Sequence, residues 1–394
     1  MPDEKLSPIL FLGTQMAVGG SQHVLLTLAR WFHQHGYRVV AAFIYDRDGL
    51  YQQWRSNEPF PVISLEAKQA KSGKLSFYGF LQSIIRLYRL MIRERFAVVT
   101  TFTHHSNLVG IPLAWLAGVP VRIAAHRGRI DKFPRGLERS HCMMINSGMA
   151  NCLVANSSYV RDQAIAGEGV KSEKMVVIPN GIGREFRLIS EDALSRAASV
   201  TAARQRLCGV LGIPQQAQLI LSVGRLTDQK GHIYLVDAMP YVLEHFPEAL
   251  VLLAGDGSAR QGLEERVQEL GIGGAVRFLG TRSDIPALLA VADLFVLPSI
   301  SEGMPNALLE AMGMGVPVLA SSLGCVEEIV THGETGYLVS PGDAGVLGET
   351  IVSLLENPDL RMRLGKAGRE MVEKKYTVEQ MCESYERIFK QFKQ

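Results

Sequence analysis

Two glutamates, Glu302 and Glu310, flank the segment of the chain with the strongest chemical signature. A predicted strand, Leu294–Pro298, ends just before Glu302, and a helix is predicted to begin near Asn306. Loop amides and the positive end of that helix would face a ligand beyond the strand, and Glu310 could accept hydrogen bonds from a diol. Glutamates at this spacing are usually surface charges, but the strand, loop and helix, with Gly303 after the first glutamate, favour a ligand site.

A second candidate site follows the predicted strand Leu219–Val223, between Gly224 and Gly231. Arg225 can bind phosphate oxygens in a bidentate way, and Lys230 supplies a compact charge beside the start of a helix. A solvated loop is the alternative, but two cations at a strand end in an acidic half of the chain favour a phosphate site. Further along, Gly255-Asp256-Gly257 fits an ordinary turn as well as a close approach to a ligand.

The first half of the chain offers weaker candidates. Gly19 and Gly20 lie between a predicted strand and a helix, where backbone amides could bind an anion, although a tight turn is an equal alternative. They are not part of a GxGxxG sequence, so a dinucleotide site is unsupported. His126 ends a predicted strand and is expected to point into a cleft, with a purely structural histidine as the alternative. Arg127 and Arg129 beside it favour an anionic ligand.

Composition and charge narrow the class of protein. The 394 residues are 47% hydrophobic and 20% charged, enough for a large core and two domains. A net charge of +2 argues against a nucleic-acid binder, although residues 1–185 are basic and residues 186–394 are acidic. Five cysteines without a CxxC pair indicate neither a disulfide framework nor a zinc knuckle and favour a reducing cytoplasm. Neither a signal peptide nor a membrane span is predicted.

The elements that must position these residues alternate in a regular way. Short apolar runs are followed by longer stretches of helical periodicity, which is typical of parallel α/β sheets covered on both faces. The pattern occurs twice, so the predicted fold class is α/β, with two doubly wound Rossmann-like domains facing across a cleft. Strands are predicted at Ile9–Gly13, Val39–Ile44, Val98–Phe102, Val121–His126, Cys152–Asn156, Met175–Ile178, Leu219–Val223, Leu250–Ala254, Val276–Phe278, Leu294–Pro298, Val316–Ala320 and Gly336–Leu338.

The polar stretch from Arg184 to Pro214 marks the predicted boundary between the domains. The predicted domains are therefore residues 1–185 and 186–376, followed by a helix over 377–394. This last helix has an apolar face that could cap either domain, formed by Met381, Tyr385, Ile388 and Phe389.

Two further patterns allow more than one interpretation. Asp46-Arg47-Asp48 has the spacing of a divalent-cation site, but Gly49 follows it and a turn is preferred. Residues 68–95 hold seven basic residues with Phe77, Phe80, Leu81, Ile84, Tyr88 and Met91 at helical spacing. A helix packed on a sheet is favoured over a membrane helix, while Lys68, Lys71 and Lys74 could contact anionic lipid.

With these motifs in view, the chain resembles the retaining nucleotide-sugar glycosyltransferases of the GT-B fold, family four type, also called glycosyl transferases group 1. The resemblance covers most of the chain and is more specific in the second half. It rests on Gly19-Gly20, Ile178-Pro179-Asn180-Gly181, Gly224-Arg225-Leu226 with Lys230-Gly231, and the segment from Glu302 to Glu310.

The resemblance implies a role for each matched residue. Arg225 and Lys230 correspond to the pair that neutralises the departing diphosphate, Glu310 to the ribose-binding carboxylate, and His126 to the histidine that approaches the transferred sugar. Gly19 and Gly20 correspond to the loop that closes over the diphosphate. The sugar and phosphate would be held by Glu302 and the amides of Gly303, Met304, Pro305 and Asn306, and the base by Thr281 and Arg282. Gln22 and Gly183 depart from the family pattern, which often has acids there.

The implied reaction is retaining hexosyl transfer from a nucleotide sugar, with UDP preferred, to a glycan or lipid-linked acceptor in polysaccharide or glycoconjugate synthesis. No cofactor, no required metal and no nucleic-acid partner are expected, and the enzyme is predicted to be cytoplasmic and peripheral on an anionic inner membrane face. The alternatives are a nucleotide-sugar epimerase of the same fold and a non-catalytic glycan- or nucleotide-binding scaffold. A dehydrogenase is weaker, because neither domain opens with the required glycine fingerprint.

Overall fold

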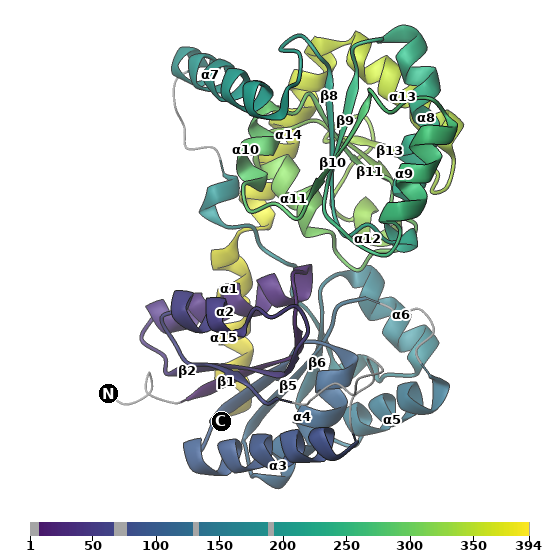
Figure 1. Cartoon of the computed structure of the whole chain (residues 1–394). Coiled ribbons are helices and arrows are strands. Elements are labelled where there is room, and N and C mark those ends of the chain that lie inside the picture. The colour runs from purple at the N-terminus through teal and green to yellow at the C-terminus, as the bar shows by residue number, and fades with distance from the viewer. Residues whose placement is uncertain (1–7, 67–76, 129–133, 188–192, 394) are drawn as a thin grey trace. The chain divides into compact units, whose positions relative to one another are not determined.

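A computed structural model describes residues 8–66, 77–128, 134–187 and 193–393 (Figure 1). The chain divides into two compact units. Unit 1 comprises residues 1–180 together with 378–394, and unit 2 comprises residues 181–377. The predicted boundary at 185 and 186 lies five residues beyond this division.

Unit 1 is built on a seven-stranded parallel sheet with the strand order β3-β2-β1-β4-β5-β6-β7. Its strands are β1 (Ile9–Met16), β2 (Val39–Asp46), β3 (Val62–Ser64), β4 (Val98–Thr101), β5 (Val121–His126), β6 (Cys152–Ala155) and β7 (Met175–Val177). Its helices are α1 (Gly20–Gln34), α2 (Tyr51–Asn57), α3 (Phe77–Glu94), α4 (His104–Leu116), α5 (Arg135–Asn146), α6 (Ser158–Glu168) and α15 (Val378–Lys393). A short 3₁₀ turn, η2 (Ser172–Lys174), precedes β7.

Alternation along the strands explains how both faces of this sheet are covered. Ile9 and Phe11 of β1 pack with α1 and α15, whereas Leu10 and Leu12 pack with α3 and α4 on the opposite face (Figure 1). Successive strand side chains point to opposite faces, so a sheet buried on both sides needs an almost continuous apolar run. This is why the strand predictions here were close to the observed bounds. The short edge strand β3 was not predicted.

The carboxyl-terminal helix α15 belongs to unit 1. The four residues predicted as its apolar face, Met381, Tyr385, Ile388 and Phe389, are all buried. Phe389 stacks on Phe32 of α1 with ring centroids 5.1 Å apart. The predicted amphipathic helix therefore caps the first of the two sheets.

Unit 2 is built on a six-stranded parallel sheet with the order β10-β9-β8-β11-β12-β13. Its strands are β8 (Leu219–Val223), β9 (Leu250–Ala254), β10 (Val276–Gly280), β11 (Leu294–Leu297), β12 (Val318–Ser321) and β13 (Tyr337–Val339). Its helices are α7 (Ala193–Leu211), α8 (His232–His245), α9 (Arg260–Glu269), α10 (Ile285–Val291), α11 (Asn306–Gly313), α12 (Gly324–Glu327), α13 (Ala344–Glu356) and α14 (Pro358–Lys375). Two 3₁₀ turns, η3 (Arg184–Phe186) and η4 (Asp228–Lys230), complete it.

The same alternation covers both faces of the second sheet. Leu219 and Leu221 of β8 pack in one core with α10 and α11, while Ile220 packs in another with α8 and α13. The first strand of each unit lies inside its sheet, between a strand that follows it closely and one that comes later. Such an arrangement creates a switch point in strand order, where open α/β sheets bind ligands beyond the carboxyl ends of the strands.

Candidate active site

The switch point of unit 2 lies between β8 and β11, and it brings Lys230 to Glu302. Lys230 Nζ lies 2.6 Å from Glu302 Oε1, to which the buried Ser299 donates a second hydrogen bond of 2.8 Å. The Glu302 side chain is only 8% exposed and that of Lys230 19%. The two charges, predicted from separate motifs, thus form a partly buried pair at the edge where a ligand is expected.

Backbone contacts hold the two loops of this pair together. The Ile300 amide donates to the Gln229 carbonyl at 3.0 Å, and the Gln229 side chain donates to the Ser301 carbonyl at 3.2 Å. Gly231 has a φ of 63°, and a Cβ there would lie 2.0 Å from the Pro298 carbonyl oxygen. Only glycine fits this turn, so η4 and the loop after β11 are fixed against each other.

The glycines after β9 make a second close approach. A Cβ on Gly255, whose φ is 149°, would lie 1.8 Å from the Gly224 carbonyl oxygen, and one on Gly257 would lie 2.3 Å from that of Leu226. The Gly255 amide also donates to the Gly280 carbonyl at 2.8 Å. The close packing of neighbouring backbone accounts for the glycines at positions 255 and 257.

The two arginines that were also predicted for the site of unit 2 differ in their surroundings. Arg225 is exposed in the loop after β8. Arg282 is bound by Asp284, with its Nε and Nη2 donating to the two carboxylate oxygens at 2.8 and 2.6 Å. Thr281 beside it is exposed. The guanidinium of Arg282 is thus already paired, and a base in this segment would meet mainly Thr281 and the backbone.

Glu310 lies on α11, one turn after its start. Burial, and then the nearby Glu185 of η3, raise the pKa of this carboxyl to about 7. The α11 helix packs closely on the segment that contains η3, since a Cβ on Gly313 would lie 2.2 Å from the Ile182 side chain. Near neutral pH Glu310 is therefore present in both protonation states.

The segment before α11 needs one correction. Gly303, Met304 and Pro305 are buried and Asn306 begins the helix. Pro305 was grouped with residues whose amides would hold the sugar and phosphate, but proline has no backbone N–H and cannot donate. In this segment the backbone N–H groups belong to Gly303, Met304 and Asn306.

A buried histidine in unit 2 was missed at the sequence level. His232 follows Gly231 at the start of α8, and burial together with the Lys230 ammonium lowers its pKa to about 4. It is therefore neutral near pH 7, so it adds no charge beside Lys230. Its position directly after the glycine turn was the only sequence signal for it.

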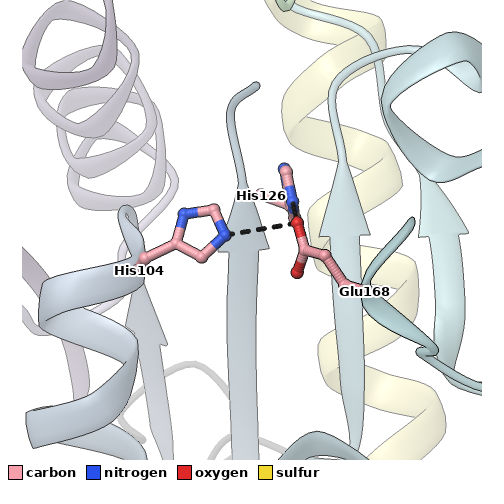
Figure 2. Close-up of side chains that lie close together, drawn as sticks. All are labelled: His104, His126 and Glu168. Atoms are coloured by element: carbon pink, nitrogen blue, oxygen red, sulfur yellow. Dashed lines mark hydrogen bonds and ion pairs between the residues drawn. The ribbon is translucent and has the colours of Figure 1, made fainter. Parts of the chain in front are cut away.

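The corresponding edge of unit 1 carries a buried cluster around Glu168, shown in Figure 2. His126 Nε2 lies 2.6 Å from Glu168 Oε1, and His104 Nε2 lies 3.6 Å from the same oxygen. The His104 and His126 rings meet edge to face, with centroids 4.5 Å apart. The two histidines are 4% and 1% exposed. His126 therefore lies at the end of β5 as predicted, but its side chain, which was expected to point into a cleft, is buried against a carboxylate.

A third histidine approaches the other carboxylate oxygen. His141 Nδ1 lies 3.6 Å from Glu168 Oε2, and its Nε2 faces Asn107 Nδ2 at 3.0 Å. The same Nδ2 donates to the Ala125 carbonyl at 3.0 Å, while Asn107 Oδ1 accepts from Thr101 at 2.6 Å. A carbonyl can only accept, so this network orients the Asn107 amide and makes His141 Nε2 an acceptor.

The cluster changes the acid–base properties of its members. Burial tends to raise the pKa of Glu168, but the hydrogen bond from His126 and the nearby rings of His104 and His141 hold it well below its usual value. Burial lowers the pKa of both His126 and His141 below that of a free histidine. Glu168, His104 and His141 were missed because they come from three separate helices, and only the pair His104-His105 after a predicted strand hinted at them.

The arginine beside His126 has partners within unit 1. Arg127 donates to the Asn180 side-chain oxygen at 2.7 Å and to the Tyr385 hydroxyl at 3.0 Å, and its guanidinium lies 5.1 Å from the Phe102 ring centre. These contacts attach α15 to the sheet, which gives Arg127 a structural role. Arg129, the second cation of that prediction, lies outside the described residues.

Other candidates of unit 1 take positions near the first strand. Gly19 caps α1 with an extended backbone and Gly20 begins the helix. Gln22 donates from its side chain to the Gln15 carbonyl at 3.2 Å. The Asp46 carboxylate accepts two backbone hydrogen bonds of 3.0 Å, from Leu50 and Tyr51. Through these two bonds, Asp46 stabilises the turn that leads into α2.

Comparison with protein families identifies both halves of the chain. Residues 204–371 match the model described as glycosyl transferases group 1. Residues 19–181 match a glycosyl transferase 4-like domain. The two matches correspond closely to units 2 and 1.

Individual relatives give the same picture. The chain is 27% identical over 295 residues to UDP-Gal:alpha-D-GlcNAc-diphosphoundecaprenol alpha-1,3-galactosyltransferase of Escherichia coli, which covers 73% of this chain and 74% of that protein. It is 31% identical over 206 residues to the lipopolysaccharide core biosynthesis glycosyltransferase LpsE of Rhizobium meliloti (strain 1021), which covers 52% of this chain and 58% of that protein.

Among solved structures, Anabaena Alr3699/HepE in complex with UDP and glucose superposes with a TM-score of 0.84 at 22% identity, covering 98% of this chain and 100% of that one. This likeness establishes the GT-B fold, with one parallel α/β sheet of seven strands and one of six. The predicted fold class is therefore confirmed. Both family matches and the fold agree, and the chain belongs to the glycosyl transferases group 1 family and is a glycosyltransferase.

Proposed function

We propose that this glycosyltransferase moves a hexosyl unit from a UDP-sugar to a glycan or lipid-linked acceptor with retention of the anomeric configuration. The observation that carries the proposal is the Lys230–Glu302 pair at the switch point of unit 2, 2.6 Å apart and partly buried. A cation held at this edge by a buried carboxylate is positioned before any ligand arrives. Such preorganised charge is the main means by which enzymes stabilise developing charge.

The proposed chemistry follows from these groups. When the sugar–phosphate bond breaks, negative charge grows on the diphosphate while the sugar becomes oxocarbenium-like. Lys230 and the exposed Arg225 would neutralise that charge, which is why we propose that the diphosphate needs no metal ion. Glu310 would accept hydrogen bonds from the ribose. The departing phosphate would help to remove the acceptor proton as the acceptor attacks from the same face.

The relatives support the choice of donor and acceptor. The Escherichia coli relative is named for a UDP-galactose donor and a diphosphoundecaprenol-linked acceptor, and HepE was solved with UDP and with UDP-glucose. A UDP-hexose and a lipid-linked glycan are therefore the substrates to test first.

The proposal is tested with a thermal-shift panel of UDP, GDP, ADP and their common sugars, with EDTA present. A ligand that binds only the folded state must raise the melting temperature. We expect a selective shift with UDP-type ligands. Absence of any shift, confirmed by calorimetry, would favour a non-catalytic scaffold, and turnover of UDP-N-acetylglucosamine without an acceptor would favour an epimerase.

The roles of Glu310 and His126 can be separated. Glu310→Ala should weaken UDP binding, because the carboxylate would contact the ribose. His126→Ala should reduce transfer more than binding, because this residue is proposed to act near the transferred sugar. Equal losses of binding in both variants would contradict this division of roles.

The helix α3 supports an anionic membrane surface as the second partner. Its residues Phe80, Leu87 and Met91 pack on the sheet, but a second apolar row remains exposed. This outer row of α3 consists of Tyr78, Leu81, Ile85, Tyr88 and Ile92, which are 36–69% exposed. The spacing alternates between three and four residues, so the row forms one continuous stripe along the helix.

Charge favours lipid as the occupant of this stripe. Arg86, Arg89 and Arg93 are exposed immediately beside it, with Glu66 and Glu94 as the acids that pair with two of them. An apolar stripe with flanking arginines suits the interface of an anionic bilayer. In the described part of the chain, no helix is long and apolar enough to span one. Lys68, Lys71 and Lys74, also predicted as lipid contacts, lie outside the described residues.

Flotation with vesicles of phosphatidylcholine, with and without phosphatidylglycerol, tests this surface. We expect binding only to the anionic vesicles, lost in Leu81→Ser/Ile85→Ser. A matched control is Val346→Ser, which alters an exposed apolar residue at the start of α13. Binding that is unaffected by Leu81→Ser/Ile85→Ser would overturn the assignment, and dimerisation lost in that variant would instead identify a second copy of the chain as the occupant.

A further inference from the structure

Three side-chain atoms converge in the buried cluster of unit 1 (Figure 2). They are Nε2 of His104, Nε2 of His126 and one carboxylate oxygen of Glu168, all within 4.8 Å of one another. The three side chains are 5%, 1% and 8% exposed. They come from the start of α4, the end of β5 and the end of α6. Residues far apart in sequence therefore place two imidazoles and one carboxylate around a single point.

The spacing of these atoms is close to that of ligand atoms around a metal ion. In a tetrahedral zinc site with bonds of about 2.0–2.2 Å, ligand atoms lie about 3.3 Å apart. The measured separations from Glu168 Oε1 are 2.6 Å to His126 and 3.6 Å to His104, on either side of that value. Side-chain rotations that move these atoms by less than about 1 Å would bring all three to ligating distance from one ion.

A third histidine lies beside the carboxylate, where an outer contact to a metal ligand is usually found. Glu168 Oε2, the oxygen that is not shared, faces His141 Nδ1 at 3.6 Å, and neither atom has a hydrogen-bond partner. His141 is fully buried, and Asn107 makes its Nε2 an acceptor, so the ring proton lies on Nδ1, toward Glu168. Outer contacts of this kind orient metal ligands and are part of most metal sites.

The charge of the cluster also favours a bound cation. Every described ion pair of Glu168 is to a histidine, and no described lysine or arginine pairs with it. A buried carboxylate is costly unless it is paired or coordinates a cation. A divalent ion would supply the compensating charge directly.

We propose that His104, His126 and Glu168 form a binding site for a divalent transition-metal ion, with Zn²⁺ as the best fit. Two imidazole nitrogens and one carboxylate oxygen are ligands that zinc prefers, and three protein ligands leave one position open. On binding, the ion replaces the proton shared by His126 Nε2 and Glu168. That ring proton moves to Nδ1, and a long 3.4 Å contact with the Gly128 amide is lost.

This site is distinct from the diphosphate site, although it uses His126, the residue proposed to act near the transferred sugar, and its test needs no nucleotide sugar. The diphosphate groups belong to unit 2, whereas all three ligands here belong to unit 1. The ion would tie α4, β5 and α6 together and would fix the ring of His126. Chelation should therefore lower the stability of unit 1 while leaving UDP binding unchanged.

The test uses the full chain, purified without a histidine tag and freed of metal with a chelator that is then removed. Titration with Co²⁺ should give a visible d–d absorption that saturates at one equivalent of the ion. Zn²⁺ should displace the Co²⁺ and raise the melting temperature. His104→Ala and Glu168→Gln should each weaken Zn²⁺ binding at least 100-fold by calorimetry. His141→Ala should weaken it 10- to 100-fold, as loss of an outer contact does.

His105→Ala provides the matched control, because this exposed histidine adjoins His104 on the same helix and should leave Zn²⁺ binding unchanged. Circular dichroism establishes that each variant is folded, and His104→Ala keeps the test open where Glu168→Gln is unstable. The proposal is overturned if the metal-free protein takes up no Co²⁺ or Zn²⁺. It is equally overturned if His104→Ala binds both ions as the unmodified protein does.

Discussion

The segments at the carboxyl edges of the two sheets are held together in different ways. In unit 2 the loops after β8, β9 and β11 are joined by backbone hydrogen bonds and by glycines at which a Cβ would lie within 2.0 Å of a carbonyl oxygen. In unit 1 the strand β5 and the helices α4, α5 and α6 are joined by buried polar side chains that converge on Glu168. A backbone junction depends on glycines at fixed positions, whereas a side-chain junction depends on residues from distant elements.

The largest expected effect tests the backbone junction of unit 2. Gly255→Ala places a Cβ 1.8 Å from the Gly224 carbonyl oxygen at a φ of 149°, and neither backbone can move easily. We expect the free energy of unfolding to fall by more than about 4 kcal/mol, measured by urea denaturation.

Gly262→Ala is the matched control for that variant. Gly262 lies in α9, and a Cβ there would meet nothing within 4 Å. Alanine in a helix is favoured over glycine by about 1 kcal/mol, so stability should rise slightly. Equal effects at the two glycines would show that the close contact at Gly255 does not determine the junction.

The next effect concerns catalysis. Lys230→Ala removes the charge proposed to neutralise the diphosphate and leaves Glu302 without its cation. We expect turnover to fall about 10²- to 10³-fold, measured with UDP-sugar under saturating conditions. Lys366→Ala, at an exposed position of α14, should leave turnover unchanged. Full activity of Lys230→Ala would rule out the proposed role of this lysine.

A smaller effect tests the side-chain junction of unit 1. Asn107→Ala removes hydrogen bonds to the Ala125 carbonyl, Thr101 and His141 at a fully buried position. Leaving buried polar groups unsatisfied should lower the free energy of unfolding by about 2–3 kcal/mol. Asn57→Ala, at an exposed helix end, should change it by less than about 0.5 kcal/mol. A comparable result for both would mean that the cluster adds little to unit 1.

The smallest effect is a pH dependence in unit 2. The pKa of Glu310 is about 7 in the folded protein, against a usual value of 4.5. The folded state therefore holds its proton more tightly, and the associated stability is complete below pH 4.5 and lost as the pH rises through 7. Glu310→Gln removes this loss, so the variant should gain about 1–2 kcal/mol over the unmodified protein between pH 6 and pH 8.

Urea denaturation at the two pH values measures this difference. Glu356→Gln, at the exposed end of α13, is the control. A Glu310→Gln variant whose relative stability stays constant from pH 6 to pH 8 would contradict the raised pKa.

The sequence alone determined the architecture and the two residues that pair at the switch point of unit 2. Strands buried on both faces must be almost continuously apolar, so β5, β8 and β9 were predicted with their observed bounds. The groups around Lys230 and Glu302 were also predicted, because each belongs to a local motif of a strand, a loop and a helix start. Such motifs consist of neighbouring residues, so they can be identified from the sequence.

The tertiary structure decided what depends on distant residues. It paired Lys230 with Glu302 and Arg127 with Tyr385, and it gathered three histidines around Glu168. None of these pairings has a fixed spacing in sequence. They arise because a parallel sheet brings the ends of separate strands to one edge, and the strand order that sets those neighbours is fixed only when the whole sheet packs.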